Sequence, residues 1–352
     1  MYPSASHPSY GVFIKNFEES FILNGFTVHK AIIEGRSRSK FYKLFKYIRF
    51  FFDVYRNLIT KEFDLIYVHY IGHSLLPLVP IQWGLQKPLV INAHGGDVFT
   101  ASKLGRLIQK FVEPIVKKSA LVVVPSSYFE DIVTQRFSIP KENIFISPSG
   151  GINTSLFKSP TNRRKKNVFT LGYISRIDEG KGWDVLLNAV NVLVKQNSIN
   201  IKLIMIGGGA QEAQFVENIK KLGLDKVVNY FGLISQKDLP NFINQMDLFV
   251  FPTRLPESLG LVGLEAMACG VPVIGADIGG LKGYIKSGYN GELFEPGNHT
   301  ELASVINKFI QLDESGLNVY SRNAQVTAQE YDSRKVSEKL LQRLYLLLSS
   351  ER

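Results

Sequence analysis

Apolar and polar positions follow two spacings along this chain. Short apolar runs of the length of buried strands occur at 63–69, 88–93, 121–125, 144–148, 168–173, 201–206, 227–231, 247–251 and 271–275. Between these runs, apolar residues recur three and four positions apart, which is the spacing of one helix face, as at 12–23 and 260–268. Because strands that alternate with helices form parallel sheets covered by helices, the pattern predicts an α/β protein.

Residues 36–61 combine an apolar stripe with many basic side chains. The stripe predicts an amphipathic helix, and residues 27–33 ahead of it alternate as a strand does. Asp53 is the only acidic residue between Arg36 and Lys61. Basic and aromatic side chains together are typical of a helix on an anionic membrane surface. The basic contacts would come from Lys40, Lys43, Lys46 and Arg49. The alternative is a stripe that packs into the core below a solvated basic face.

The length and composition favour two domains. The chain has 352 residues, of which 45% are hydrophobic and 20% are charged, as in a folded globular protein. A polar, basic segment interrupts the alternation of strands and helices near residue 155. We therefore predict two facing doubly wound, Rossmann-like domains with the active cleft between them. The predicted boundaries are 1–153 for the first domain, 154–167 for the linker and 168–330 for the second domain.

The first domain departs from the usual start of this architecture. Doubly wound domains normally open with a buried strand that leads into a glycine loop. Here the turn-rich residues 1–11 lead directly into the helical pattern at 12–23. We expect codons upstream of Met1 to encode a short apolar run followed by a glycine-containing turn.

Charge and cysteine content narrow the classes of partner. The formal net charge of +10 indicates an anionic partner, and on charge alone nucleic acid, anionic lipid and phosphorylated substrates all fit. The basic run at 163–166 carries no interleaved aromatic residues, so we expect no nucleic-acid partner. The single cysteine, Cys269, is expected to be a packing residue in a reducing compartment. Since no run of about 20 apolar residues and no signal peptide is visible, we expect a cytoplasmic protein.

The stretch 252–280, PTRLPESLGLVGLEAMACGVPVIGADIGG, carries the strongest candidate chemistry. Its loop leads into a helix that begins near Gly260, and the free N–H groups of such an entry favour an anion. Glu257 and Glu265 flank this entry and would be repelled by the anion, so they must bind another part of the same ligand. A nucleotide-diphosphate sugar fits this division, since its phosphates would bind the amides of Gly260 and Leu261 while its hydroxyls bind the carboxylates.

A glycosidase acid/base pair is the competing interpretation of the two carboxylates. Eight helical residues span about 12 Å. Glycosidase carboxyl groups lie about 5–5.5 Å apart in retaining enzymes and about 6.5–9.5 Å apart in inverting ones. We therefore interpret Glu257 and Glu265 as binding residues.

Two further sets of candidate residues fall in loops that follow predicted strands, where ligands commonly bind in α/β proteins. Arg176 and Lys181 are five positions apart in a glycine-containing loop between strand and helix, where they suit a diphosphate. His69 and His94 end predicted strands, and in open α/β sheets ligands bind beyond the carboxyl ends of strands. The two glycines after His94 allow close backbone approach, and Asp97 follows them. His69 is expected to form a pocket wall.

Together these motifs resemble the retaining, nucleotide-sugar-dependent glycosyltransferases of GT-B architecture, family-4 type. Two glutamates eight positions apart are followed by AMACGVPVI and a Gly-Gly turn. A Gly-Arg-x-x-x-x-Lys-Gly motif is present with Ser175 in place of the first glycine, and a His-Gly-x-Asp pattern starts at His94. In the segment that resembles the family's Asn-Gly-Val-Asp, Gly150 and Asn153 replace the Asn and the Asp. The resemblance is strong from Leu171 to Gly280 and weaker in the first domain.

The resemblance implies a role for each candidate residue. His94 would face the donor sugar or its phosphate, and the final helix, 331–352, would return to the first domain. The implied catalytic residues are His94, Arg176, Lys181 and Glu257. The implied donor-binding residues are Gly11, Arg176, Lys181, Gly232, Ile234, Glu257, Leu259, Gly260, Leu261 and Glu265. The implied acceptor-side residues are His69 and Asp97.

We therefore predict a hexosyltransferase that moves a sugar from a nucleotide-diphosphate sugar to a saccharide hydroxyl with retention of configuration. The acceptor is expected to be lipid-linked, in cell-surface polysaccharide or glycolipid synthesis, at the inner face of the cytoplasmic membrane. No Asp-x-Asp pair occurs, so no metal site is expected, and no cofactor is expected besides the co-substrate. The alternatives are a nucleotide-sugar epimerase of the same fold and a non-catalytic sugar-nucleotide-binding relative.

Overall fold

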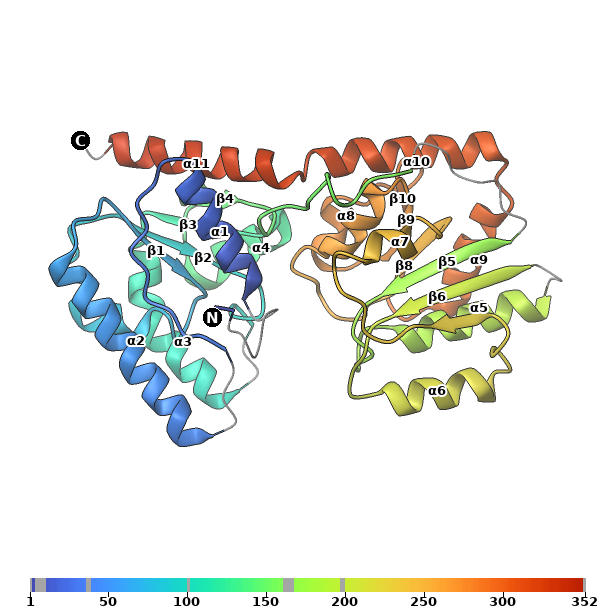
Figure 1. Cartoon of the computed structure of the whole chain (residues 1–352), viewed down its shortest axis with the longest axis horizontal. Helices are drawn as coiled ribbons and strands as arrows, with labels where there is room; N and C mark the ends of the chain where they lie inside the picture. Colours follow the sequence, from blue (N-terminus) through green and yellow to red (C-terminus); the bar gives the residue numbers. More distant parts are fainter. Residues whose placement is uncertain are drawn as a thin grey trace. The chain divides into compact units, whose positions relative to one another are not determined.

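The chain forms two compact units (Figure 1). Unit 1 comprises Met1–Gly150 and Arg334–Arg352, and unit 2 comprises Gly151–Ser333. In this computed structural model the described residues are 2–3, 11–35, 39–99, 102–160, 168–196 and 200–350. Within these ranges no helix has the length and apolar character needed to cross a membrane.

Unit 1 is built on a parallel sheet of four strands in the order β1-β2-β3-β4. The strands are β1 (Ile66–His69), β2 (Leu89–Asn92), β3 (Leu121–Val124) and β4 (Ile144–Ile146). The α-helices are α1 (Val12–Leu23), α2 (Lys40–Thr60), α3 (Lys103–Lys117), α4 (Ser127–Phe137) and α11 (Ser333–Ser350), and the 3-10 helices are η1 (Leu76–Ile81) and η2 (Lys141–Asn143).

Alternate residues of the buried strands point to opposite faces of this sheet. Val90 packs with Phe17 of α1 and Leu344 of α11, while the next residue, Ile91, packs with Val112 of α3 on the other face. Figure 1 shows α1 and α11 on one side of the sheet and α2 and α3 on the other. Both faces are therefore covered, which explains why the central strands read as continuous apolar runs.

Unit 2 is a parallel sheet of six strands in the order β10-β9-β8-β5-β6-β7. The strands are β5 (Phe169–Ile174), β6 (Ile201–Ile206), β7 (Val228–Tyr230), β8 (Leu248–Phe251), β9 (Val273–Ala276) and β10 (Gly291–Phe294). The helices are α5 (Trp183–Gln196), α6 (Glu212–Lys221), α7 (Leu239–Ile243), α8 (Leu261–Ala268), the 3-10 helix η3 (Gly279–Gly283), α9 (His299–Ile310) and α10 (Glu314–Gln329).

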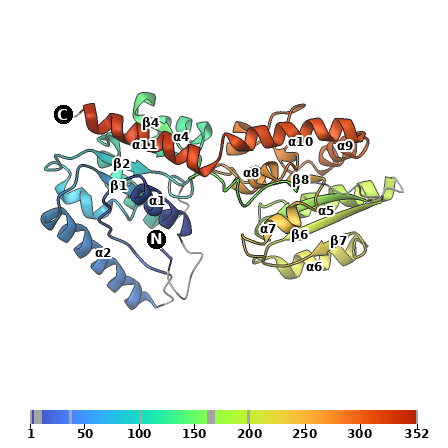
Figure 2. The ribbon, with the colours of Figure 1, turned by 45° about the horizontal axis from the view of Figure 1, so that its top comes forward.

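Two cores flank the sheet of unit 2. Leu203 and Met205 of β6 belong to the core beneath α5, α6 and α9, while Ile204 and Ile206 belong to the core beneath α7, α8 and α10. Figure 2 shows α8 and α10 side by side on one face. The strand order is that of a Rossmann sheet, with the topological switch between β5 and β8. The predicted α/β architecture of two Rossmann-like domains is confirmed.

Two local predictions were wrong, and one strand was not predicted. Residues 27–33 form no strand and pair with none among the described residues, because the alternation of apolar and polar positions does not supply a hydrogen-bonding partner. Strand β10 at 291–294 was not among the strands predicted from the apolar runs. The long helical pattern expected from 302 to 348 is divided at 311–313 and 330–332 into α9, α10 and α11.

The apolar residues of α2 do not all pack into the core, as the alternative interpretation of this helix would require. Phe50, Val54 and Leu58 pack inward or partly inward, but a second set of large apolar side chains faces solvent. This exposed stripe consists of Phe41, Tyr42, Leu44, Phe45, Ile48, Phe52 and Ile59. α2 therefore has two apolar faces, and the described part of unit 1 covers only one of them.

Candidate active site

The two loops that carry the predicted diphosphate ligands start at one edge of the unit 2 sheet. β5 and β8 are hydrogen-bonded neighbours, so the loops that follow them diverge from the switch point. The backbone N–H of Arg254 donates to the carbonyl of Gly180 at 2.7 Å, which joins the two loops directly. The topology thus brings the loop of Arg176 and Lys181 next to the loop of Glu257.

The close approach of these loops depends on Gly182. Its φ of +75° lies in the left-handed region, and a Cβ at this position would lie 1.8 Å from the carbonyl oxygen of Pro252. Only glycine satisfies both conditions. Gly182 is therefore part of what positions the neighbouring Lys181.

Lys181 and Glu257 form a partly buried ion pair at this edge. The Nζ of Lys181 lies 2.6 Å from Oε1 of Glu257, and the two side chains are 13% and 19% exposed. The hydroxyl of Thr253 also donates to Oε1 of Glu257, at 3.3 Å. The pair holds a cation and a carboxylate side by side, as needed for a ligand that carries phosphates next to hydroxyl groups.

Arg176 is held more loosely. Its guanidinium lies 2.6 Å from Oδ2 of Asp178, but its side chain is 70% exposed. The other carboxylate oxygen of Asp178 accepts the backbone N–H of Ala210. Exposed ion pairs contribute about 0–1 kcal/mol, so an incoming anion can compete for this guanidinium at little cost.

The N terminus of α8 adds backbone donors to the same edge. Gly260 caps the helix with φ +84°, and a Cβ there would approach Leu281 to 2.6 Å. No described side chain caps this helix end, and its first turn carries no acidic residue. The first-turn amides, which include that of Leu261, point out of the helix and are suited to bind an anion. Leu259, just before the cap, is buried in the core.

Glu265 lies on α8 and has a different partner from Glu257. It is buried, and the side-chain amide of Gln236 donates to its Oε1 at 2.9 Å. Burial raises the pKa of Glu265, and the hydrogen bond from Gln236 partly offsets this effect. Gln236 follows β7 in the same loop as Gly232 and Ile234, so Glu265 contacts the loop that carries these two predicted donor-binding residues.

A second cluster lies in unit 1, at the carboxyl ends of β1 and β2. Nδ1 of His69 and Nε2 of His94 are 3.0 Å apart, with the two rings stacked. Phe13 and Tyr70 pack against His94 with ring centroids 4.7 and 4.6 Å away. Phe13 lies two residues after Gly11, which caps α1 with φ +77°, so the start of α1 lies beside the histidines.

Burial governs the protonation of this pair. Desolvation lowers the pKa of His94 to about 3 and that of His69 well below its ordinary value. Both imidazoles are therefore neutral at pH 7, and the contact between them is a single hydrogen bond.

Asp97 fixes the loops that surround the histidines. One carboxylate oxygen accepts the backbone N–H of Ile71 at 2.7 Å, and the other accepts that of His94 at 2.8 Å. Burial raises the pKa of Asp97, and the backbone hydrogen bonds lower it. Both oxygens thus bind backbone at the ends of β1 and β2, and the assigned acceptor-side role stays a prediction.

The basic residues of α2 have mixed partners. Lys43 is exposed, while the Nζ of Lys46 donates to the carbonyl of Glu34 and lies over the ring of Tyr42. Arg49 lies 3.8 Å from Asp53. The side chain of Lys40 lies outside the described part of the structure.

Sequence reasoning missed three residues that shape the donor-side cluster. Gln236 contacts Glu265, Thr253 contacts Glu257, and the hydroxyl of Tyr284 donates to the carbonyl of Gly260 at 3.1 Å. The place of Gln236 in the loop that follows β7 was the available signal. In the described ranges, no group of three or more His, Cys, Asp and Glu side chains is arranged to hold a metal ion.

Each half of the chain matches the model of a known protein family. The model of glycosyl transferases group 1 matches residues 155–326, and that of glycosyltransferase family 4 matches residues 16–155.

Several curated proteins are similar over most of the chain. D-inositol 3-phosphate glycosyltransferase of Stackebrandtia nassauensis is 26% identical over 271 residues, which cover 70% of this chain and 60% of that protein. The capsular polysaccharide biosynthesis glycosyltransferase CapM of Staphylococcus aureus is 28% identical over 236 residues, which cover 64% of this chain and 60% of that protein. The chain therefore spans less than two thirds of the length of these relatives.

Solved structures agree on the fold. Sucrose-phosphate synthase from Thermosynechococcus elongatus has a TM-score of 0.78 at 18% identity, with 99% of this chain and 96% of that chain covered. Anabaena Alr3699/HepE in complex with UDP has a TM-score of 0.71 at 25% identity, with 84% and 82% covered.

Proposed function

The chain belongs to the group 1 glycosyl transferases, which have the GT-B fold, and from this premise we propose that it transfers a sugar from a nucleotide-diphosphate sugar to a saccharide hydroxyl. The Lys181–Glu257 pair at the switch point of unit 2 carries the proposal. It presents a cation for phosphate and a carboxylate for hydroxyl groups at the place where open α/β sheets bind ligands.

In this proposal, each part of the donor binds the side chains or amides that complement its charge. Its diphosphate lies against Arg176, Lys181 and the first-turn amides of α8. Its ribose hydroxyls donate to Glu265, and its sugar hydroxyls donate to Glu257. The separate partners of the two glutamates support this division, since Glu265 contacts the loop after β7 and Glu257 contacts the loop after β5.

Charge stabilisation of the leaving group carries most of the catalysis. When the bond between the anomeric carbon and the diphosphate breaks, negative charge develops on the departing oxygen. Arg176, Lys181 and the α8 amides are already in place to stabilise that charge, which is the condition for a large electrostatic effect. We propose retention of configuration and independence from metal ions, because the family resemblance implies both.

Removal of either cation tests the reaction. Arg176→Ala or Lys181→Ala is expected to reduce turnover about a hundred- to a thousandfold, since loss of one preorganised donor costs about 2.7–4 kcal/mol. Lys221→Ala on the exposed end of α6 is the matched control and should turn over like the parent. Parent-like turnover of both site variants would refute the proposed role.

The printed names of two similar proteins support a choice of donor and acceptor to test. HepE was solved with UDP, and CapM is named for capsular polysaccharide synthesis. We propose a uridine nucleotide sugar as the first donor to test, and a lipid-linked saccharide acceptor in polysaccharide or glycolipid synthesis. Incubation with the donor alone separates this activity from that of an epimerase, which would isomerise the donor without an acceptor.

We further propose that α2 binds the anionic inner face of the cytoplasmic membrane. Its solvent-facing stripe includes Phe41 at 82% exposure and Phe52 at 63%. Lys43 and Arg49 lie among these apolar residues, and this combination of apolar stripe and basic rim is complementary to an anionic lipid surface.

Vesicle sedimentation tests the membrane contact. Each basic residue near an anionic surface contributes about 1 kcal/mol, which salt screens. Lys43→Glu with Arg49→Glu should move the protein from the vesicle pellet to the supernatant. Reversal of the same number of charges at Lys220 and Lys221 on α6 should leave it in the pellet. Equal sedimentation of the α2 variant and the parent would exclude α2 as the anchor.

A further inference from the structure

Helix α3 exposes a row of apolar side chains along one flank. Leu104, Leu107 and Phe111 are all exposed, Phe111 at 59%, and their spacing of three and four positions places them in line. Ile108 and Val112, on the adjoining face, are buried in the core of unit 1. α3 therefore carries apolar side chains that the described part of unit 1 does not cover.

Trp83 continues this row at the end of α3. Its ring is 79% exposed, and the Nζ of Lys118 lies 3.1 Å from the ring centroid. Lys118 follows Phe111 by about two helical turns, so it lies on the same flank. Tryptophan is enriched at membrane interfaces, because its ring is apolar and its N–H group is polar. The α3 surface, as the term is used below, consists of Leu104, Leu107, Phe111 and Trp83.

A row of basic residues runs beside the α3 surface. Lys103, Arg106 and Lys110 are exposed, and each comes directly before an apolar residue of the row in the sequence. The next position of the same series is Glu113, whose carboxylate lies 2.7 Å from the Nζ of Lys117. Apolar side chains next to basic ones complement an anionic lipid bilayer, which is negatively charged at its surface and apolar beneath.

The α3 surface lies on the same side of the unit 1 sheet as α2. Figure 1 shows both helices there, and both contact the 3-10 helix η1. The hydroxyl of Tyr55 on α2 donates to the carbonyl of Pro77 in η1 at 2.8 Å, and Trp83 comes shortly after the end of η1. Apolar side chains gathered on neighbouring elements mark a binding surface, whereas single exposed ones are common on any protein.

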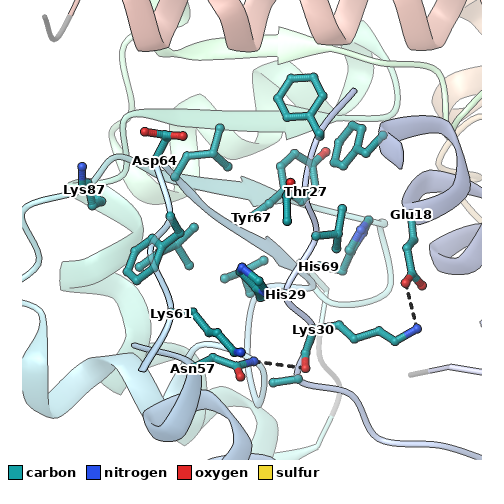
Figure 3. A pocket seen from close by; sticks show the side chains of 18 of the residues that line it. Glu18, Thr27, His29, Lys30, Asn57, Lys61, Asp64, Tyr67, His69 and Lys87 are labelled. Carbon is teal, nitrogen blue, oxygen red and sulfur yellow. Dashed lines mark hydrogen bonds and ion pairs between the residues drawn. The ribbon is translucent and has the colours of Figure 1, made fainter. Parts of the chain in front are cut away.

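The inner face of α2 is directed toward the rest of unit 1. Phe50 and Val54 of α2 line a cavity of about 930 Å³, which also has β1 and segment 27–33 in its walls. Figure 3 shows Asn57 of α2, whose side-chain amide donates to the carbonyl of Lys30 at 3.1 Å. These contacts set the rotation of α2 about its axis, which leaves its exposed stripe in solvent.

We propose that the α3 surface enters the apolar layer of an anionic bilayer together with the exposed stripe of α2. This contact rests on the membrane binding proposed above for α2, to which it adds a second line of apolar residues. One amphipathic helix lets unit 1 rotate about the helix axis, whereas two fix the side of unit 1 that faces the lipid. An isologous contact between two copies of the chain is less favourable, because the same basic rows would then meet.

Serine substitution in the apolar row tests its contact with lipid. Leu107→Ser with Phe111→Ser is compared with the parent for sedimentation with vesicles of equal parts phosphatidylglycerol and phosphatidylcholine. The partition coefficient should fall about tenfold or more, because the variant loses the transfer of two exposed apolar side chains into lipid. Val319→Ser with Val326→Ser, which changes two exposed apolar residues on α10 of unit 2, is the matched control and should sediment like the parent.

Tryptophan emission reports the contact independently of sedimentation. The chain has two tryptophans, and the other one, Trp183, is buried in unit 2 at 3% exposure. Anionic vesicles that contain lipids brominated in their acyl chains should therefore quench the emission of Trp83 in the parent. They should not quench the emission of a Trp83→Phe variant, in which only the buried Trp183 remains.

Either of two results would overturn the contact of α3 alone: equal sedimentation of the serine variant and the parent, or an unquenched Trp83 in a parent that sediments. The contact of α2 would then stand, since Lys43→Glu with Arg49→Glu tests it separately. A parent that does not sediment with these vesicles would refute both contacts. A serine variant that converts a parent dimer to a monomer without vesicles would assign the α3 surface to a second copy of the chain.

Discussion

The histidine pair shows how burial sets the chemistry of single residues in unit 1. His69 and His94 share one hydrogen bond, and desolvation keeps both rings neutral. The other charged group at these strand ends, Asp97, accepts two backbone hydrogen bonds. A neutral imidazole can orient a donor sugar through a hydrogen bond without adding charge, in keeping with the role that the family resemblance implies for His94.

The buried histidines predict a pH dependence of stability. Below pH 6.5 an unfolded histidine binds a proton, while the folded one, with its lowered pKa, does not. The unfolded state then binds more protons, so the free energy of unfolding falls as the pH drops from 6.5 toward the folded pKa, which is about 3 for His94. Each such histidine contributes about 1.4 kcal/mol per pH unit in this window and nothing above it.

His69→Phe isolates this contribution. Urea unfolding at pH 7.0 to 5.0 should give a shallower loss of stability in the variant than in the parent. The raised pKa values of Asp97 and Glu265 act with the opposite sign, but they are present in both proteins and cancel in the difference. Parallel pH curves for the two proteins would mean that His69 is not buried and neutral.

The sequence identified the charged residues of the candidate site better than their partners. Arg176, Lys181, Glu257 and Glu265 were found because each belongs to a local motif with fixed spacing. The pairing of Lys181 with Glu257 joins residues 76 positions apart, so no local pattern could reveal it. Gln236 was missed for the same reason, since its contact with Glu265 is set by the neighbouring positions of β7 and α8 in space.

At the scale of elements, the close contact between the loops after β5 and β8 predicts that a side chain at Gly182 is not tolerated. Gly182→Ala adds a methyl group where the carbonyl oxygen of Pro252 lies 1.8 Å away, at a left-handed φ. The left-handed conformation alone costs about 1–3 kcal/mol, and the clash adds to it. We expect a lower free energy of unfolding and reduced sugar transfer, because the loop that holds Lys181 must move.

Gly283→Ala is the matched control for this element. Its added Cβ meets nothing within 4 Å, and its φ is not in the left-handed region. Its stability should change by less than about 1 kcal/mol. Equal stability of the two alanine variants in urea unfolding would contradict the tight junction of the loops.

Element boundaries were predicted where burial and periodicity agree. α1 and β6 match the predicted ranges 12–23 and 201–206 because their apolar spacing is unbroken. Segment 27–33 has the alternation of a strand but faces a cavity, and the helical pattern after 302 hides two turns. Hydrogen-bonding partners and chain reversals depend on the rest of the fold, so periodicity cannot supply them.

At the scale of the whole molecule, the alternation of strands and helices was sufficient to predict two Rossmann-like units. The strand order was not readable from the pattern, yet the proposed function depends on it, because it places the β5 and β8 loops at one switch point. The residues of the proposed donor site, which come from two loops and one helix end, therefore lie close together in unit 2.

A thermal-shift panel of nucleoside diphosphates first identifies the base. A ligand at a hundred times its dissociation constant adds about 2.7 kcal/mol to the free energy of unfolding. The nucleoside diphosphate with the correct base should therefore raise Tm more than the others do.

Calorimetric titration of that nucleoside diphosphate and its sugar derivative into the parent, Glu265→Gln and Glu257→Gln then tests the central claim. Glu265→Gln should weaken both ligands by about 1.5–3 kcal/mol, the contribution of a charge-assisted hydrogen bond. Glu257→Gln should leave the diphosphate's affinity unreduced while the sugar nucleotide binds more weakly and transfer falls. If both variants bind the two ligands like the parent and transfer is unchanged, the two glutamates are packing residues and the proposed donor site is wrong.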